Sequence, residues 1–313
     1  MLNELSVVIP AYRSEALIAR TLESILQEGV LAENIIVVED GVFDNTKATL
    51  DKYNIKHIVQ AKNMGAPKAR NVGLAEVKTK YVMFIDSDDF VSDKLISGLI
   101  EVANSANADI AFGPWRFDGD KMKTGTLRYP PALTSSEWVL FWLNYGVIPT
   151  CSVLWRVDSI RSICGWDERL KKNQDGEIVI RAFLNDFNIG VSTQGYSTYW
   201  QHESQHRVSD AHIIDRDFTS NIVYELIMSK AANVKQRHYS YEIGRYCCKE
   251  SWMCFSNSYI EGGASWKSRA QAHGYSKKGY SLATNIFGGL FGYKFGAKVK
   301  HFLFPYFKKL IYK

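Results

Sequence analysis

The chain of 313 residues has no apolar run long enough to cross a bilayer, for which a helix needs about 20 consecutive apolar residues. No signal-peptide pattern precedes the first apolar run, which begins at Leu5. The five cysteines are odd in number and lack the spacing of zinc ligands, which is typical of free thiols in a reducing compartment. These absences favour a cytoplasmic globular protein.

Two further absences concern the fold and the distribution of charge. No Gly-x-Gly-x-x-Gly motif follows the first apolar run, so a standard dinucleotide-binding fold is not expected. No Asp or Glu occurs after Glu261, whereas ten Lys and Arg lie from Gly262 onward. The net charge of +5 is therefore concentrated at the C-terminal end, and the rest of the chain is slightly acidic.

The first part of the sequence alternates between strand and helix patterns. Buried-strand patterns cover residues 5–12, 34–41 and 81–85, and a weaker strand pattern covers residues 56–60. Residues 14–26 have apolar side chains at helical spacing. Strands that alternate with helices predict a doubly wound, mostly parallel sheet flanked by helices, which is an α/β fold.

The most informative segment is the apolar run from Tyr81, which ends in the three carboxylates of Asp86, Asp88 and Asp89. Open α/β sheets bind ligands at the carboxyl ends of their strands. Clustered carboxylates repel one another unless a cation joins them, and Mg²⁺ or Mn²⁺ usually binds one or two carboxylates plus substrate phosphates. The segment therefore indicates a divalent ion that holds a phosphorylated ligand. The alternative is a solvated, aspartate-rich loop at a strand end.

These strand ends occur together with the short motifs Asn63-Met-Gly65, Ala69-Arg-Asn71 and Gln174-Asp175. In this order they resemble the family 2 glycosyltransferases, which are inverting enzymes with the GT-A fold. The resemblance implies a nucleotide-sugar transferase domain of that fold over residues 1–209. Residues 210–313 are expected to form a helical C-terminal region with a basic, aromatic tail.

The resemblance also implies where the nucleotide-sugar binds. Asp40 matches the acid that reads the base, since a carboxylate accepts a hydrogen bond from a ring N–H such as that of uracil. Asp86 would accept a hydrogen bond from a ribose hydroxyl. The other residues expected at the nucleotide-sugar are Ala11, Tyr12, Glu15, Asn63, Gly65, Lys68, Arg70 and Ser87. For Lys68 a solvated helix face is the alternative, and Asn63 and Gly65 are also ordinary turn residues.

The metal ligands implied by the resemblance are Asp88, in the Asp86-Ser-Asp88 motif, and His202. Asp88 would coordinate a Mn²⁺ or Mg²⁺ cofactor that bridges the two phosphates. His202 aligns with a family segment near the diphosphate, where an imidazole can bind a metal or donate to phosphate. A structural, hydrogen-bonded histidine is the alternative.

The catalytic base is expected at Asp175, at the start of a helical pattern. A Glu-Asp pair supplies the base in the resembling family, and here Gln174-Asp175 keeps the aspartate. A general base needs one carboxylate within reach of the acceptor hydroxyl. Glu177 and Asp167 are the alternatives, and the helix dipole alone also favours acids at this position.

The basic tail mixes lysines with aromatic residues, a composition typical of segments that bind an anionic membrane surface. No nucleic-acid motif accompanies it, so nucleic acid is not an expected partner. The alternative is a tail packed on its own domain. With this tail, the chain is expected in the cytoplasm, peripheral on the inner face of the cell membrane.

The expected function is inverting transfer of a hexosyl or N-acetylhexosaminyl group from a nucleotide-sugar, a UDP-sugar by preference, to a hydroxyl of a glycan or lipid-linked acceptor in surface polysaccharide synthesis. Two alternatives remain open from the sequence. A nucleotidyltransferase shares the sheet and the metal, but usually has a glycine-rich, basic loop after the first strand, where this chain has Pro10-Ala-Tyr-Arg-Ser14. A non-catalytic nucleotide-sugar-binding module could keep the fold without Asp175.

Overall fold

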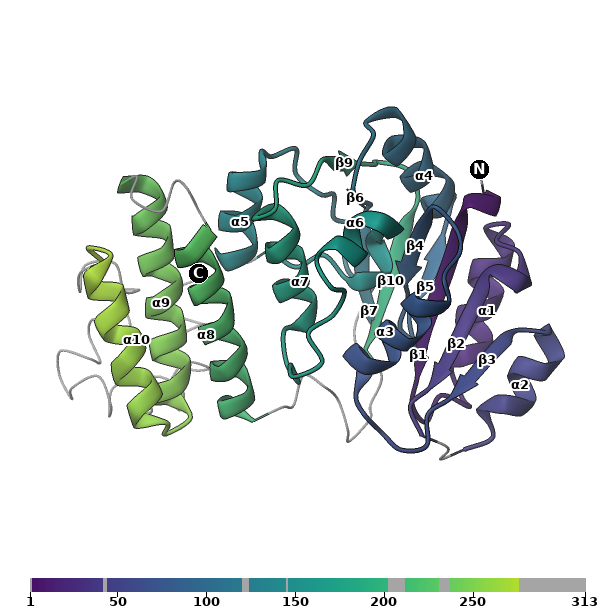
Figure 1. Ribbon diagram of the computed structural model, residues 1–313, viewed down its shortest axis with the longest axis horizontal. Helices are drawn as coiled ribbons and strands as arrows, with labels where there is room; N and C mark the ends of the chain where they lie inside the picture. Colours follow the sequence, from purple (N-terminus) through teal and green to yellow (C-terminus); the bar gives the residue numbers. More distant parts are fainter. Residues whose placement is uncertain are drawn as a thin grey trace. The chain divides into compact units, whose positions relative to one another are not determined.

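The computed structural model describes residues 2–41, 44–119, 124–144, 146–201, 212–230 and 237–275. The chain divides into two compact units, one of Met1–Ser135 with Val147–Arg207 and one of Ser136–Gly146 with Val208–Lys313. The first unit contains the sheets and the second is helical (Figure 1). The sequence did not predict that a segment from the middle of the α/β region would join the helical unit.

The first unit is built on a seven-stranded sheet with the order β3-β2-β1-β4-β8-β6-β9. Its strands are β1 (Leu5–Ala11), β2 (Ile35–Glu39), β3 (Lys56–Val59), β4 (Tyr81–Phe84), β6 (Ile110–Phe112), β8 (Val153–Arg156) and β9 (Ile189–Val191). Neighbouring strands are parallel except at β8, which runs antiparallel to β4 and β6. The predicted mostly parallel α/β sheet is confirmed.

Helices lie against both faces of this sheet (Figure 1). They are α1 (Ile18–Gln27), α2 (Thr46–Tyr53), α3 (Ala66–Glu76), α4 (Leu95–Ser105), α6 (Val157–Ser162) and α7 (Gln174–Phe183), with short 3₁₀ turns η1 (Leu2–Glu4), η2 (Ala32–Asn34) and η3 (Thr150–Ser152). Leu5, Val7 and Ile9 of β1 belong to the core with α1 and α4. Val8 points the other way, toward Gly73 of α3. Burial on both faces explains why the β1 sequence is a continuous apolar run.

Gly73 provides a test of this packing, because a Cβ atom there would lie 2.3 Å from Cγ1 of the buried Val8. Alanine favours the helix by about 0.5–1 kcal/mol, but overpacking a core typically costs about 1–3 kcal/mol. We therefore expect Gly73→Ala to lower the free energy of unfolding measured in urea. The exposed Ala75→Ser on the same helix is the control and should change it by no more than about 0.5 kcal/mol. An unchanged free energy of unfolding in Gly73→Ala would contradict the close approach of α3 to β1.

A second sheet of three strands, not predicted from the sequence, has the order β5-β10-β7. It consists of β5 (Phe90–Ser92), β10 (Tyr196–Gln201) and β7 (Trp115–Gly119). β5 follows directly after the acidic turn at Asp86–Asp89, and β10 pairs with β5. This sheet therefore connects the acidic turn to a distant part of the sequence.

The second unit contains the helices α5 (Ser135–Asn144), α8 (Ile213–Lys230), α9 (Arg237–Ser256) and α10 (Ile260–Ala272). Trp266 is fully buried and makes edge contacts with Tyr224 and Tyr246. Its indole N–H donates a 2.6 Å hydrogen bond to Asp217, so the ring is both packed and satisfied. The predicted helical C-terminal region is confirmed, while the tail beyond residue 275 lies outside the described residues. Within the described part of the chain, no helix combines the length and the hydropathy that a bilayer span needs.

Candidate functional site

The sites predicted from the sequence gather at one edge of the large sheet. β1, β2 and β4 are adjacent and parallel, so the loops that follow them meet at their carboxyl ends. Two hydrogen bonds show this directly. The Asp40 N–H donates to the Ala11 carbonyl at 2.8 Å, and the Ser14 and Ser87 hydroxyls lie 2.7 Å apart. The structure therefore brings Ala11, Asp40 and Ser87 together, as open α/β sheets do at their ligand sites.

Asp89 of the acidic turn points into the protein. It is 1% exposed, and its Oδ1 accepts a 2.9 Å hydrogen bond from the Trp200 N–H of β10. The Thr21 hydroxyl donates to the Asp89 carbonyl at 2.7 Å. Burial raises the pKa of Asp89 well above its usual value, and the negative charges of Asp88 and Asp86 raise it further. Asp89 thus fixes the acidic turn to the small sheet.

Asp86 and Asp88 remain on the accessible side of the turn. The Asp86 side chain is 32% exposed, and the Asp88 carbonyl is held by a 2.8 Å hydrogen bond from Arg20. The Arg20 guanidinium lies against both Phe90 and Trp200, at 4.6 and 4.2 Å from their ring centres. The backbone of the acidic turn is therefore rigidly supported, and two carboxylates stay at the strand end.

Mg²⁺ or Mn²⁺ usually binds through one or two protein carboxylates when substrate phosphates supply further oxygens. Asp88, with Asp86 beside it, fits such an ion. Among the described residues no group of three or more His, Cys, Asp or Glu could hold a metal unaided. His202, the other predicted ligand, lies outside the described residues.

Arg70 lies at the centre of the site and is only 2% exposed. Its guanidinium donates to Asp86 at 2.6 Å and to the Gln174 side-chain oxygen at 3.3 Å, and it lies 3.7 Å from Asp175 Oδ1. It also stacks on Trp166, 4.4 Å from the ring centre. Burial lowers the pKa of Arg70, but Asp86 and Asp175 raise it more, so the group stays charged. Arg70 therefore connects the acidic turn to the start of α7.

Asp175 is the first acid of α7. Its side chain is 45% exposed, yet its Oδ1 is buried and accepts no hydrogen bond from any described residue. Burial of this oxygen raises the pKa of Asp175. The nearby Arg70 lowers this pKa, the negative charge of Asp86 raises it further, and a hydrogen bond from Thr150 lowers it. A carboxylate with a raised pKa and an accessible edge is suited to accept a proton.

The two alternative bases are engaged elsewhere. Glu177 is 2% exposed and forms an ion pair of 2.7 Å with Arg181 one turn along α7. Asp167 is bound by Arg169 at 2.6 Å, and this hydrogen bond lowers the pKa of Asp167. Both carboxylates therefore serve local structure, which favours Asp175 as the acid that remains for chemistry.

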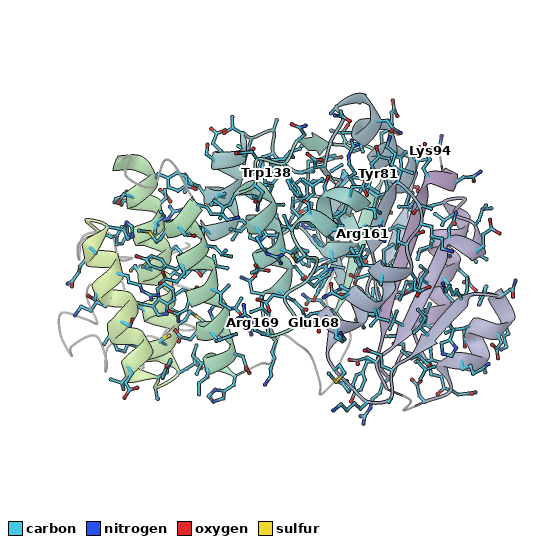
Figure 2. All side chains as sticks on the ribbon, in the orientation of Figure 1. Tyr81, Lys94, Trp138, Arg161, Glu168 and Arg169 are labelled. Carbon is cyan, nitrogen blue, oxygen red and sulfur yellow. The ribbon has the colours of Figure 1, made fainter. Side chains whose placement is uncertain are left out.

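The turn before α7 is fastened to α3 by Asn71. Its amide donates to the Trp166 carbonyl at 2.9 Å and accepts from the Trp166 N–H at 2.9 Å. Gly165 precedes the tryptophan with φ of +61°, and a Cβ atom there would lie 2.6 Å from the Asn71 side-chain oxygen. Glu168 and Arg169 continue this turn (Figure 2). The Gly-Trp-Asp motif is the sequence signal for a role of Trp166 that sequence reasoning missed.

Asp40 is 3% exposed and organises the loop after β3. It accepts hydrogen bonds from the Gln60 amide at 2.9 Å and from the backbone N–H groups of Met64 and Gly65 at 2.6 and 2.8 Å. These donors take three of the carboxylate's roughly four acceptor positions, which leaves one for a ligand. Gly65 has φ of +92°, and Asn63 is exposed beside it.

The remaining predicted nucleotide contacts lie toward solvent. The Tyr12 side chain is 39% exposed, and Glu15 is tied to the loop after β2 by a 3.2 Å hydrogen bond from the Asn45 N–H. Lys68 forms a 3.2 Å ion pair with Glu168, and both side chains are more than one third exposed. A pair this exposed adds little stability, so Lys68 is easily released to another anion.

Tyr199 is a site residue that the sequence reasoning missed. It belongs to β10 and packs edge-on against Phe117 of β7. Burial raises the pKa of Tyr199, and the charges of the Asp86, Asp89, Asp88 and Asp175 carboxylates raise it further. The phenol therefore stays protonated beside these acids and can donate a hydrogen bond; its position shortly before His202 was the only signal in the sequence.

Comparison with known proteins identifies the family of the chain. The family model described as glycosyl transferase family 2 matches residues 6–162. TarS of Staphylococcus aureus, a poly(ribitol-phosphate) β-N-acetylglucosaminyltransferase, is 28% identical over 228 residues, which cover 68% of this chain and 38% of TarS. WfaP of Escherichia coli, a UDP-Glc:α-D-GlcNAc-diphosphoundecaprenol β-1,3-glucosyltransferase, is 30% identical over 146 residues, or 46% of this chain and 54% of WfaP. The chain thus spans less than two thirds of the length of these curated relatives.

Solved structures show the same fold. A crystal structure of S. aureus TarS 1–349 in complex with UDP-GlcNAc aligns with a TM-score of 0.69 and 18% identity over 95% of this chain and 91% of that chain. The mannosyltransferase PcManGT from Pyrobaculum calidifontis, in complex with GDP-Man and Mn²⁺, aligns with a TM-score of 0.58 and 12% identity over 96% of this chain and 87% of that chain. At these identities the likeness concerns the fold.

Proposed function

The chain belongs to glycosyl transferase family 2, and on this premise we propose that it transfers a sugar, with inversion, from a UDP-sugar to a hydroxyl of a glycan or lipid-linked acceptor. The observation that carries the proposal is the pairing of two carboxylate sites joined through Arg70. Asp86 and Asp88 lie at the end of β4, where a nucleotide diphosphate would bind, and Asp175 faces the other terminal nitrogen of Arg70 and is partly exposed.

For the donor, we assign the base to the loops after β1 and β2. The one free acceptor position of Asp40 would take the ring N–H of uracil, with Tyr12 and the Asn63–Gly65 turn beside it. Asp86 would accept from the ribose, on the oxygen that Arg70 leaves open. When bound at Asp88, Mn²⁺ or Mg²⁺ supplies positive charge to the leaving diphosphate.

For the transfer itself, Asp175 would take the proton of the acceptor hydroxyl. The acceptor oxygen then forms a bond to the anomeric carbon, while the bond from that carbon to the diphosphate oxygen breaks and its electron pair leaves with UDP. Attack from the face opposite the diphosphate inverts the anomeric centre. The geometry supports this division of roles, because Asp86 is bound by Nη2 of Arg70 while Asp175 faces Nη1.

The acceptor class is proposed from the relatives. TarS is named for poly(ribitol-phosphate), which is a polymer, and WfaP for α-D-GlcNAc on diphosphoundecaprenol, which is a lipid-linked sugar. We therefore propose an acceptor from surface polysaccharide synthesis, either polymeric or linked to a lipid carrier.

Incubation of the full chain with a panel of nucleotide-sugars and Mn²⁺ tests the proposal. Release of a nucleoside diphosphate from one donor, dependent on Asp175, supports transfer. A nucleotidyltransferase would instead make a nucleotide-sugar from a nucleoside triphosphate and a sugar phosphate, releasing pyrophosphate. Binding of a nucleotide-sugar with no turnover in any mixture would favour a binding module.

The basic C-terminal tail, whose described part ends at residue 275, is proposed to hold the enzyme on anionic membranes from the cytoplasmic side. Ten Lys and Arg lie from Gly262 onward with no acidic residue, and each near such a surface contributes about 1 kcal/mol. A truncation after Thr284 keeps α10 whole, so it should stay folded and release UDP while losing vesicle binding. Flotation with anionic vesicles at low and high salt measures this. Failure of the full chain to float at low salt would favour a tail packed on its own domain.

A further inference from the structure

We infer that Arg70 is a positioning residue that acts through Asp175, and that the neutral side chain at Gln174 leaves the guanidinium charge available to that carboxylate. The inference deepens the proposed function and rests on it for the role of Asp175 as base.

Arg70 is buried and contacts both the acidic turn and the start of α7. The side chain is 2% exposed, so solvent does not screen its charge. One nitrogen, Nη2, donates to Asp86 at 2.6 Å, while Nη1 faces both Gln174 Oε1 at 3.3 Å and Asp175 Oδ1 at 3.7 Å. The ring of Trp166, 4.4 Å away, covers one face of the guanidinium and keeps it in place. The two terminal nitrogens of one rigid, planar cation therefore fix Asp86 on the donor side and Asp175 on the acceptor side relative to each other.

Residue 174 is a neutral glutamine beside Asp175. Gln174 is 6% exposed and shares Nη1 with Asp175. A carboxylate at this position would form an ion pair with Nη1, whereas the amide oxygen accepts from the cation without adding a charge of its own. Arg70 would then be neutralised by two close carboxylates, and Asp175 would face an additional negative charge. The amide avoids both effects while still accepting the hydrogen bond.

The remaining neighbours of Asp175 do not provide a substitute for Arg70. Asp86 from the acidic turn adds negative charge, and Tyr199 from β10 is a neutral phenol. Thr150 from η3 donates a hydrogen bond but carries no charge. Burial and Asp86 raise the pKa of Asp175, and among these neighbours Arg70 is the charged group that opposes the rise. An opposite charge within about 4–6 Å typically shifts a carboxyl by about one to three units.

Three variants of the full chain test the inference, with Gln174→Met as the neutral control. Arg70→Met removes the charge, Arg70→Lys keeps a charge without the planar fork, and Gln174→Glu adds the competing carboxylate. The carboxyl titration of Asp175 is followed by ¹³C NMR of aspartate-labelled protein, assigned by its loss in Asp175→Asn. In parallel, kcat/KM for UDP release is measured from pH 5 to 9, and UDP binding is measured by calorimetry.

We expect Arg70→Met and Gln174→Glu to move the Asp175 titration and the acidic limb of kcat/KM to higher pH, so that kcat/KM at pH 6 falls about tenfold or more in Arg70→Met. Gln174→Met should leave the limb in place. Arg70→Lys should keep the limb near its wild-type position but lower kcat more than it raises KM, because the acceptor side is no longer held in register.

An Asp175 titration that is the same in wild type, Arg70→Met and Gln174→Glu would overturn the inference. A shift in Arg70→Met without one in Gln174→Glu would overturn the role given to Gln174. These results are independent of turnover: a wild-type protein that releases UDP from no donor contradicts the proposed function, while the NMR titration still decides whether Arg70 controls Asp175.

Discussion

Replacing Asp175 by asparagine is expected to lower the rate of sugar transfer by about 10²-fold or more, the usual contribution of a general base. Asparagine has nearly the same size and keeps the start of α7, but it cannot accept the proton of the acceptor hydroxyl. Asp175 lies 3.7 Å from Arg70 and makes no hydrogen bond to the acidic turn, so the donor side should remain intact. UDP affinity measured by calorimetry should therefore stay near the wild-type value.

The pH dependence adds a second readout for this variant. The Asp175 carboxyl can accept a proton only when it is ionised, so the wild-type rate should fall as the pH drops through the pKa of Asp175. Because this pKa is raised, the fall should begin at a higher pH than for an ordinary aspartate. The residual activity of Asp175→Asn should lack this acidic limb. Asp167→Asn is the matched control. Because Asp167 is bound to Arg169, this variant should show only a few-fold lower rate of transfer. A nearly wild-type rate in Asp175→Asn, or an equal loss of UDP binding, would refute the assignment.

Strands β1, β2 and β4 of the large sheet were predictable because they are buried on both faces, whereas β6, β8 and β9 were not predicted from the sequence. Leu5, Val7 and Ile9 face α1 and α4 while Val8 faces α3, and such a strand can be recognised as a short apolar run. The small sheet was not predictable in this way. Trp115–Gly119 and Tyr196–Gln201 mix polar, charged and aromatic residues, and their pairing joins segments about 80 residues apart in sequence.

At the site, the sequence indicated which residue types gather but not how they divide their work. The acidic turn contains three carboxylates of the same chemistry, yet Asp89 turns inward to the Trp200 N–H while Asp86 and Asp88 stay outside. That choice depends on β10, which lies far along the chain. Arg70 was expected beside a diphosphate. In the structure Arg70 donates to the side chains of Asp86 and Gln174, and its contact with the nucleotide stays a prediction.

The second large effect is expected at Asp88, where Asp88→Asn should nearly abolish transfer and remove the part of UDP binding that depends on Mn²⁺ or Mg²⁺. An amide is a weaker ligand for a hard cation and lacks the negative charge that keeps the ion beside two phosphates. Calorimetry of UDP with and without metal measures this, because binding without metal should be alike in variant and wild type.

The fold should survive this substitution, since the turn is held by the Asp88 carbonyl through Arg20 and by the Asp89 side chain, neither of which changes. Asp93→Asn is the matched control: it removes the same charge from an exposed position five residues along, where φ of +58° suits asparagine equally well. Metal-dependent UDP binding should persist in Asp93→Asn and vanish in Asp88→Asn. If both variants keep it, the ion is held by other groups, and the carboxylates at the end of β4 serve the ribose and the structure of the turn alone.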